Sequence, residues 1–247
     1  MQIIGKRKTW FSISGALILA SVLAVAVFGI NFGIDFTGGS LTELNIEGET
    51  SVSELRGSIE ELGFESARVQ PSGEDYIVRL GTLSEDEHQE LLTGLETKYG
   101  AIRELRFDMI GPVIGEEMRN KALWAIVAAL VLILLYIAWA FRKVSKPVAS
   151  WKYGLLTIVA AMHDLIIPIG VFAVLGHFLG YQIDTAFVAA LLTILGYSIN
   201  DSIVVFDRTR ENLSEIDSSE TFPSIVNRSV NQTLTRSVNT SITTLLV

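Results

Sequence analysis

The residue best suited to chemistry is Asp201, which interrupts a long apolar segment that begins near Thr185. A carboxylate inside such a segment is costly to hold in lipid, and it is tolerated mainly where it faces the interior of a helix bundle or a water path. We therefore expect Asp201 to handle protons or ions. The alternative is a structural role, in which Asp201 only forms a hydrogen bond to a neighbouring helix.

Two further ionisable residues, His163 and Asp164, are adjacent inside another apolar segment. A histidine beside a carboxylate can relay protons within a membrane. The same two groups can equally satisfy each other and close a contact between helices. The sequence leaves both interpretations open.

Segments that could cross a membrane dominate the chain, which has 247 residues of which 49% are hydrophobic. The first apolar segment is too long for the apolar region of a cleaved signal peptide, so we expect it to be retained. A fifth apolar run begins near Ile242 and stops at Val247. We predict a polytopic α-helical membrane protein with four full spans, near residues 10–30, 122–141, 155–178 and 184–206.

Basic residues near the ends of these segments predict their orientation, because lysine and arginine concentrate on the cytoplasmic side. If the spans alternate, all the basic clusters fall on one side, which places the N-terminus in the cytoplasm of a bacterium and residues 31–120 outside. The external segment carries 7 basic and 19 acidic residues, which argues against nucleic-acid binding. The clusters are Lys6, Arg7 and Lys8; Arg142, Lys143, Lys146 and Lys152; and Arg208 and Arg210.

The external segment predicts a small α+β domain. Ser51 with Glu54, and Ser84 with Glu87, have the spacing of capping boxes that open two helices. Placed between alternating strand patterns, they give the order β-α-β-β-α-β, a ferredoxin-like split unit. The expected strands are residues 41–46, 66–70, 76–80 and 102–109, and the expected helices are 51–62 and 84–99.

Conventional catalytic and metal-binding patterns are missing from the external segment. The chain has no cysteine, which excludes disulfides, thiolate zinc sites and a cysteine nucleophile. The single external histidine, His88, lies beside acidic residues and is expected on the solvated surface. We expect no cofactor, no metal and no enzymatic activity.

Glycine-rich linkers flank the external domain. One contains Gly33, Asp35, Gly38 and Gly39, and the other spans residues 111–115. Glycine permits sharp bends and close approach of backbones. The linkers are therefore either plain connectors or hinges that transmit motion between the membrane helices and the domain.

The expected organisation of the chain has four parts. They are 1–30, cytoplasmic start and first helix; 31–120, external domain with linkers; 121–206, helices two to four; and 207–247, cytoplasmic segment and start of a fifth helix.

Several segments resemble the SecF family, the accessory subunits of the bacterial Sec protein-export machinery. They are GIDFTGG at residues 33–39, His-Asp at 163–164 and GYSINDSIVVFDRTRE at 196–211. The segment VNQTLTRS at 230–237 resembles the family's cytosolic return segment. The resemblance covers nearly the whole chain in the same order, except that the fifth helix is only begun and the sixth is absent.

The resemblance implies a function and several partners. It implies six membrane helices, association with SecD and the SecYEG translocon, and use of the proton motive force to help a translocating preprotein cross the inner membrane. It also implies that Asp201 is the proton-conducting carboxylate and that Arg236 is its paired arginine at the entrance to the fifth helix. Taken alone, Arg236 has an alternative explanation as a positive anchor at a helix start.

Other functions remain open at this stage. SecF belongs to a superfamily that includes the resistance-nodulation-division exporters, so a proton-driven exporter of small molecules or lipids is an alternative. The short external domain favours protein export, because it offers little room for a drug-sized cavity. A passive scaffold, in which Asp201 only stabilises packing, is a third hypothesis.

Overall fold

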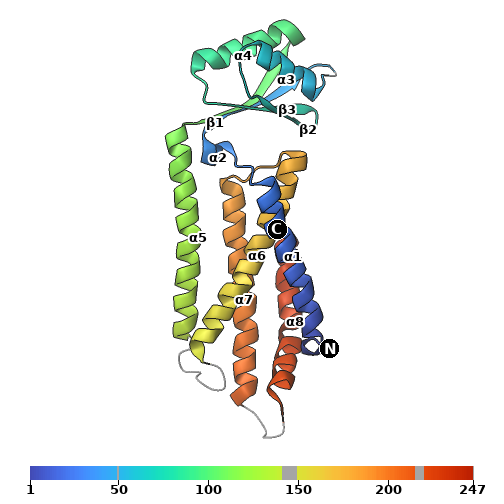
Figure 1. The fold of residues 1–247 in the computed structure, drawn as a ribbon, viewed down its shortest axis with the longest axis vertical. Helices are drawn as coiled ribbons and strands as arrows, with labels where there is room; N and C mark the ends of the chain where they lie inside the picture. The colour runs from blue at the N-terminus through green and yellow to red at the C-terminus, as the bar shows by residue number, and fades with distance from the viewer. Residues whose placement is uncertain (49, 141–148, 215–219, 247) are drawn as a thin grey trace. The chain divides into compact units, whose positions relative to one another are not determined.

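The computed structural model describes residues 1–48, 50–140, 149–214 and 220–246 (Figure 1). The predicted basic residues Arg142, Lys143 and Lys146 lie outside the described residues. The chain divides into two compact units. The sheet unit comprises Ile30–Trp124 and Phe178–Ala186, and the membrane unit comprises Met1–Gly29, Ala125–His177 and Phe187–Val247.

The sheet unit is built on four antiparallel strands. Their order is β2-β3-β1-β4, so β1 lies between its sequence-distant partners β3 and β4. Thr42 on β1 is paired with Val78 on β3 and with Phe107 on β4. This topology confirms the predicted ferredoxin-like unit. The strands are β1 (Gly39–Ile46), β2 (Arg68–Ser72), β3 (Asp75–Leu80) and β4 (Ile102–Ile110).

Two helices, α3 (Val52–Glu61) and α4 (Glu85–Tyr99), cover one face of this sheet (Figure 1). Both begin with the predicted capping box: the Ser51 hydroxyl accepts from the Glu54 amide, and the Ser84 hydroxyl accepts from the Glu87 amide. Apolar side chains from the helices and the sheet bury one another and form the core of the unit. Its fully or almost fully buried members include Leu44, Leu55, Ile59, Val78, Leu91 and Leu95.

His88 is part of this packing, so the prediction that it is a solvated surface residue was wrong. The residue is only 4% exposed. Its ring stacks on Phe107 with 3.8 Å between ring centroids, and its Nε2 lies 2.9 Å from Glu104 Oε1. The acidic neighbours in sequence point elsewhere, because His88 occupies the inward face of α4 and its polar tip finds a carboxylate on β4.

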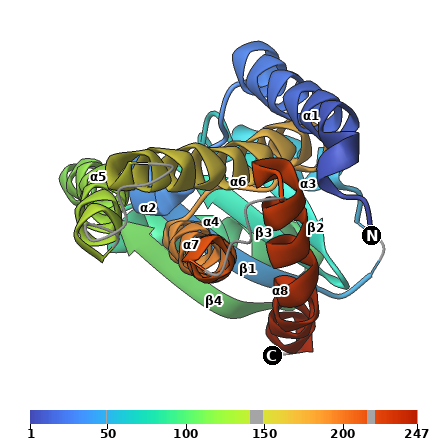
Figure 2. The same cartoon turned by 90° about the horizontal axis from the view of Figure 1, so that it is seen from below.

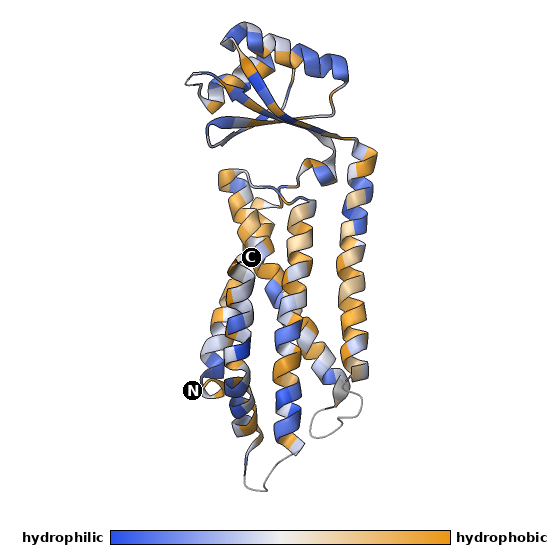
Figure 3. Ribbon diagram, turned by 180° about the vertical axis from the view of Figure 1, so that it is seen from behind, coloured by the Kyte–Doolittle hydropathy of each residue, from blue (hydrophilic) through white to orange (hydrophobic). Residues whose placement is uncertain are grey.

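The membrane unit consists of helices. Among the described residues, four helices are long and apolar enough to cross a membrane: Ile4–Phe28, Pro112–Ala140, Trp151–Leu179 and Thr185–Ser214. Figure 3 shows that most of α5 is hydrophobic, whereas the C-terminal half of α7 carries many hydrophilic residues. The helices are η1 (Ile4–Lys6), α1 (Arg7–Phe28), α5 (Pro112–Ala140), α6 (Ser150–Leu179), α7 (Thr185–Ser214) and α8 (Phe222–Leu246).

Helix α8 begins at Phe222, well before the apolar run predicted from Ile242. Its first turns are rich in Ser, Asn, Thr and Gln, and only its last residues form an apolar run. The apolar pattern of the sequence therefore indicated only the end of this helix. Helix formation needs backbone hydrogen bonds and packing rather than apolar composition, and α8 packs on its neighbours largely through polar side chains.

Helices α5, α6 and α7 share an apolar core in the membrane unit. Its buried members include Ile137 on α5, Leu165 on α6 and Leu195 on α7. Figure 2 shows α7 lying beside α6 in this unit. Helix α1 approaches α6 closely, since a Cβ added at Gly170 would lie 2.3 Å from the Cβ of Ser21. Only glycine permits that separation of the two helices.

Candidate functional site

Asp201 lies on α7 and is half-buried. Within the described part of the chain, its carboxylate has neither a hydrogen-bond partner nor an ion-pair partner. A carboxylate of this kind on a membrane helix is costly unless it meets water, a proton or a cation. The site therefore has an ionisable group whose charge the described residues leave unbalanced.

A hydrogen-bonded cluster joins α6 to Ser198, which precedes Asp201 by one turn of α7. His163 Nδ1 is 2.7 Å from Asp164 Oδ1, and the Ser198 hydroxyl on α7 donates to Asp164 Oδ2. Ser198 and Asp201 are three residues apart and therefore lie on the same side of α7. Ser198 was not identified from the sequence, because a serine in a membrane helix carries no signal until its partner on α6 is known.

The histidine of this cluster keeps one nitrogen available. His163 Nε2 is buried and has no hydrogen-bond partner among the described residues. If Nδ1 carries the proton and donates it to Asp164, Nε2 is an acceptor. The cluster thus combines a satisfied contact between α6 and α7 with a free basic nitrogen, which fits both interpretations of the pair.

Arg236 lies in the interior of α8 rather than at a helix entrance, and its side chain is exposed. Its guanidinium has no ion-pair partner among the described residues. The structure therefore does not bring Arg236 and Asp201 together. The two residues are nevertheless carried by helices that contact each other directly.

Polar side chains make that contact between α7 and α8. Asn212 Nδ2 donates to Ser229 Oγ at 2.8 Å and to Gln232 Oε1 at 2.9 Å. Arg208 Nε also donates to Gln232 Oε1, at 2.8 Å. These residues were not identified as a site from the sequence, where Arg208 was used only as an orientation signal.

In the sheet unit, the linker residue Asp35 lies on the short helix α2 (Ile34–Thr37) and contacts the start of α7. Its Oδ2 accepts from the Thr185 amide at 2.8 Å and from the Thr185 hydroxyl at 2.5 Å. The first amides of a helix have no partner within the helix, and the helix dipole favours a negative charge there. Asp35 therefore caps α7 from 150 residues away along the chain.

The linker glycines are enclosed by backbone. Gly38 has φ +72°, and a Cβ there would lie 2.7 Å from Pro112 Cα. Gly39 has φ +125°, and a Cβ there would lie 2.6 Å from the Leu80 carbonyl oxygen. Side chains are thus excluded both by conformation and by space, so this linker is packed rather than loose.

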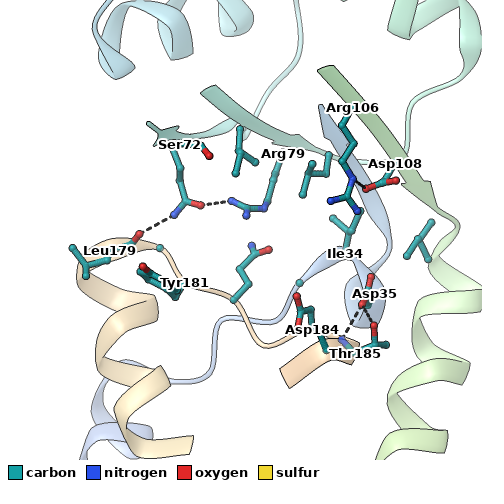
Figure 4. A pocket seen from close by; sticks show the side chains of 18 of the residues that line it. Ile34, Asp35, Ser72, Arg79, Arg106, Asp108, Leu179, Tyr181, Asp184 and Thr185 are labelled. Atoms are coloured by element: carbon teal, nitrogen blue, oxygen red, sulfur yellow. Dashed lines mark hydrogen bonds and ion pairs between the residues drawn. The ribbon is translucent and has the colours of Figure 1, made fainter. Parts of the chain in front are cut away.

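A cavity of about 990 Å³ adjoins this linker within the sheet unit (Figure 4). Its lining includes Arg79, whose guanidinium donates to Gln70 Oε1, while Gln70 Nε2 donates to the Leu179 carbonyl at 3.1 Å. Burial, and to a lesser extent the charge of Arg68, lowers the pKa of Arg79. Arg106 and Asp108 form an ion pair at 2.5 Å on the same wall.

Residues of the predicted external domain form only part of the wall of this cavity, because residues within 179–186 complete it. Its volume reaches the upper range of small-molecule pockets. Such pockets are predominantly apolar, however, whereas this lining carries the charged side chains of Asp35, Arg79, Arg106, Asp108 and Asp184.

Comparison with known proteins places these residues in recognised regions. Residues 91–247 match the family "Protein export membrane protein SecD/SecF, C-terminal", which includes the positions of Asp201 and Arg236. Residues 23–47 match the "SecD/SecF GG Motif", which includes Asp35 and the linker glycines. These matches confirm the resemblance predicted from the sequence.

Individual relatives agree with this assignment. The chain is 38% identical to the protein translocase subunit SecF of Thermobaculum terrenum, over 98% of this chain and 80% of the relative. It is 37% identical to SecF of Haemophilus influenzae, over 98% of this chain and 71% of the relative. It is 42% identical to the subunit SecDF of Thermus thermophilus, over 94% of this chain and 31% of the relative.

Solved structures share the fold. The crystal structure of Thermus SecDF, described as a translocon-associated membrane protein, matches with a TM-score of 0.87 and 38% identity. SecDF in its super-membrane-facing form matches with a TM-score of 0.64 and 37% identity. Both matches cover 100% of this chain, which spans about a third of those SecDF chains (32% and 33%).

Proposed function

The chain belongs to the SecF branch of the SecD/SecF family of protein-export membrane proteins, and from this premise we propose that it uses the proton motive force to assist Sec-dependent export. As a SecF protein it is a multi-pass membrane protein and a transport subunit rather than an enzyme. The observation that carries the proton proposal is Asp201, a half-buried carboxylate on an apolar helix without a described partner.

Proton binding at Asp201 would change the charge of α7 inside the membrane. An apolar environment favours the neutral form of a carboxyl group, and a nearby guanidinium favours the ionised form. Each elementary charge that crosses the membrane potential supplies about 2.3 kcal/mol per 100 mV. Several protons could therefore drive a rearrangement of helices.

Arg236 is the proposed switch partner of Asp201. In another conformation, movement of α8 along α7 would bring the guanidinium toward the carboxylate and release its proton. The polar contact of Asn212 with Ser229 and Gln232 supports this proposal, because it joins the two helices by hydrogen bonds that can be exchanged. Arg236→Lys keeps the charge but loses the planar fork, so it should weaken function rather than abolish it.

His163 and Asp164 form a proposed secondary relay. Asp164 is joined to Ser198 one turn from Asp201, and His163 Nε2 is free to accept a proton. A proton could therefore pass between this cluster and Asp201 through water. This role is additional to the contact that the cluster makes between α6 and α7.

The proposed partners are SecD, the SecYEG translocon and the translocating preprotein. A relative in which SecD and SecF are one chain supports association with SecD.

The basic residues that flank the spans support a cytoplasmic N-terminus in the bacterial inner membrane, with the sheet unit outside. Single cysteines at Ser72 and Ser145 should then react with an impermeant reagent from opposite sides, and reaction from one side would reject this orientation.

An exporter of small molecules or lipids remains the alternative from a different class. The cavity in the sheet unit has sufficient volume, but its charged lining suits neither an apolar drug nor a lipid chain. Protein export is therefore the function that the chain supports best.

The test is Asp201→Asn in the full-length protein together with its partners. The change preserves shape and hydrogen bonding but removes the titratable group, so translocation that depends on the proton motive force should be abolished at a normal protein level. Asp207→Asn is the matched control, since Asp207 lies on the same helix and pairs with Arg210 at 3.2 Å. Wild-type translocation in the Asp201→Asn strain would reject the proton role and favour the packing role.

A further inference from the structure

We infer that Asp35 is a positioning residue that anchors the external end of α7 to the sheet unit and transmits movement of α7 to the sheet. The inference rests on the proposed function, because transmission matters only if protonation of Asp201 moves α7. It assigns a task to the carboxylate of the linker, beyond the role of hinge or connector expected for the linker as a whole.

Asp35 caps the start of α7 from outside the helix. One oxygen of Asp35 accepts from both the amide and the hydroxyl of Thr185, the first residue of α7 (Figure 4). Asparagine caps helices about as well as aspartate, whereas alanine does not. The bond can therefore be removed or retained by choice of substitution.

The residues before α7 are hydrogen-bonded to the same linker. The Gly33 amide donates to the Ile183 carbonyl and the Ile183 amide donates to the Asn31 carbonyl, both at 2.8 Å. Asn31 Nδ2 also donates to the Tyr181 carbonyl at 3.1 Å. The linker and the segment that leads into α7 therefore form one hydrogen-bonded body, and Asp35 extends it onto the helix.

The linker is packed so closely against the sheet that the two cannot move separately. Gly39 is the first residue of β1, and its Cα faces the Leu80 carbonyl at the end of β3 so closely that no Cβ fits. Gly38 is packed in the same way against Pro112, at the start of α5. A force on Asp35 is therefore delivered to β1 and to α5 within a few residues.

Helix α7 belongs to both units. Thr185 and Ala186 are part of the sheet unit, and the helix from Phe187 onward, with Asp201, is part of the membrane unit. At 1.5 Å per residue, Asp201 is roughly 24 Å along the helix from Thr185. A continuous α-helix transmits axial displacement over such a length, and Asp35 holds the end at which the displacement arrives.

The experiment compares Asp35→Ala with Asp35→Asn in the full-length protein. Asp35→Ala should speed hydrogen exchange of the first amides of α7 by roughly five- to tenfold, the factor that corresponds to the usual effect of removing a helix cap. It should also reduce translocation driven by the proton motive force. Asp35→Asn should leave both near wild type, since its amide oxygen can accept the same bonds.

Two further variants keep the test decisive. Asp75→Ala removes a carboxylate that binds Asn45 in the same unit at 2.6 Å but does not touch α7, so it should change neither readout. Thr185→Val keeps the amide donor and loses only the hydroxyl bond, so its effect should fall between those of Asp35→Asn and Asp35→Ala. If Asp35→Ala does not accumulate, Thr185→Val replaces it.

The outcomes separate the possibilities. Loss of translocation in Asp35→Asn with unchanged exchange would overturn the inference, because Asp35 would then act through its charge. Normal exchange in Asp35→Ala would also overturn it, since α7 would not need the cap. Faster exchange with normal translocation in Asp35→Ala would show that Asp35 caps α7 but does not transmit its movement, which would reject the coupling. If Asp201→Asn leaves translocation at the wild-type level, the proton proposal fails. The hydrogen exchange of Asp35→Ala still decides in that case whether Asp35 anchors α7.

Discussion

The sheet unit and the membrane unit place half-buried ionisable side chains in different surroundings. In the sheet unit, buried His88 binds Glu104, and half-buried Arg79 binds Gln70. In the membrane unit, half-buried Asp201 lies on an apolar helix and has no partner for its charge within the residues that the structure describes. The neighbouring pair of His163 and Asp164, by contrast, is hydrogen-bonded. A buried polar group without a partner needs an explanation, and on a membrane helix the first explanation is function.

This difference separates stability from activity. The sheet unit is held by an apolar core and by capping boxes, so substitutions in that core and at those caps should act mainly on folding. The unpaired groups of the membrane unit contribute little that holds the fold together, so substitutions there should act mainly on transport. Three measurements on the sheet unit can break or sharpen this contrast.

The largest expected effect on stability comes from Leu91→Ala. Leu91 is fully buried in the core between α4 and the sheet. Truncating a buried leucine typically costs roughly 2–5 kcal/mol. We expect residues 39–110, expressed alone, to unfold cooperatively in urea and to lose this amount in the variant.

Leu105→Ala is the control, because Leu105 lies on β4 and is 44% exposed. It should change the free energy of unfolding by less than about 0.5 kcal/mol. A non-cooperative transition of the wild-type domain would show that the sheet unit depends on the membrane helices for its core.

A smaller effect is expected at the start of α4. Ser84→Ala removes the hydroxyl that accepts from the Glu87 amide, which should lower the free energy of unfolding of the same domain by about 1 kcal/mol. Ser84→Asn retains an acceptor and should remain close to wild type. Equal losses in both variants would mean that the cap contributes nothing beyond the packing of the serine.

The smallest effect concerns acid. Hydrogen bonds from Ser51 and Ser84 lower the pKa of Glu54 and Glu87 from their ordinary value of 4.5. Carboxylates with lowered pKa stabilise the folded state above the unfolded value, and that contribution is lost as the pH falls through the folded pKa. The free energy of unfolding should therefore decrease below about pH 4.5.

Glu54→Gln combined with Glu87→Gln provides the check. Glutamine can fill the same capping position but does not titrate, so the acid-dependent loss should become smaller in the double variant. An unchanged pH profile would assign the acid sensitivity of the domain to other carboxylates.

Much of this protein was determined by signals local in sequence. The capping boxes at Ser51 and Ser84 involve residues three positions apart, and the apolar spans are continuous, so both could be recognised without a structure. Strand alternation and helix order were sufficient for the ferredoxin-like unit, since few topologies fit them. Asp201 could likewise be recognised from the sequence, because a charged residue is unusual within an apolar segment.

Tertiary structure alone decided how distant residues meet. Asp35 caps α7 across 150 residues, Ser198 binds Asp164 on another helix, and Asn212 joins α7 to α8. His88 was misassigned for the same reason: whether a helical side chain faces the core depends on what packs against that helix. Such contacts arise when elements bury shared surface, and a single sequence does not record which faces will be brought together.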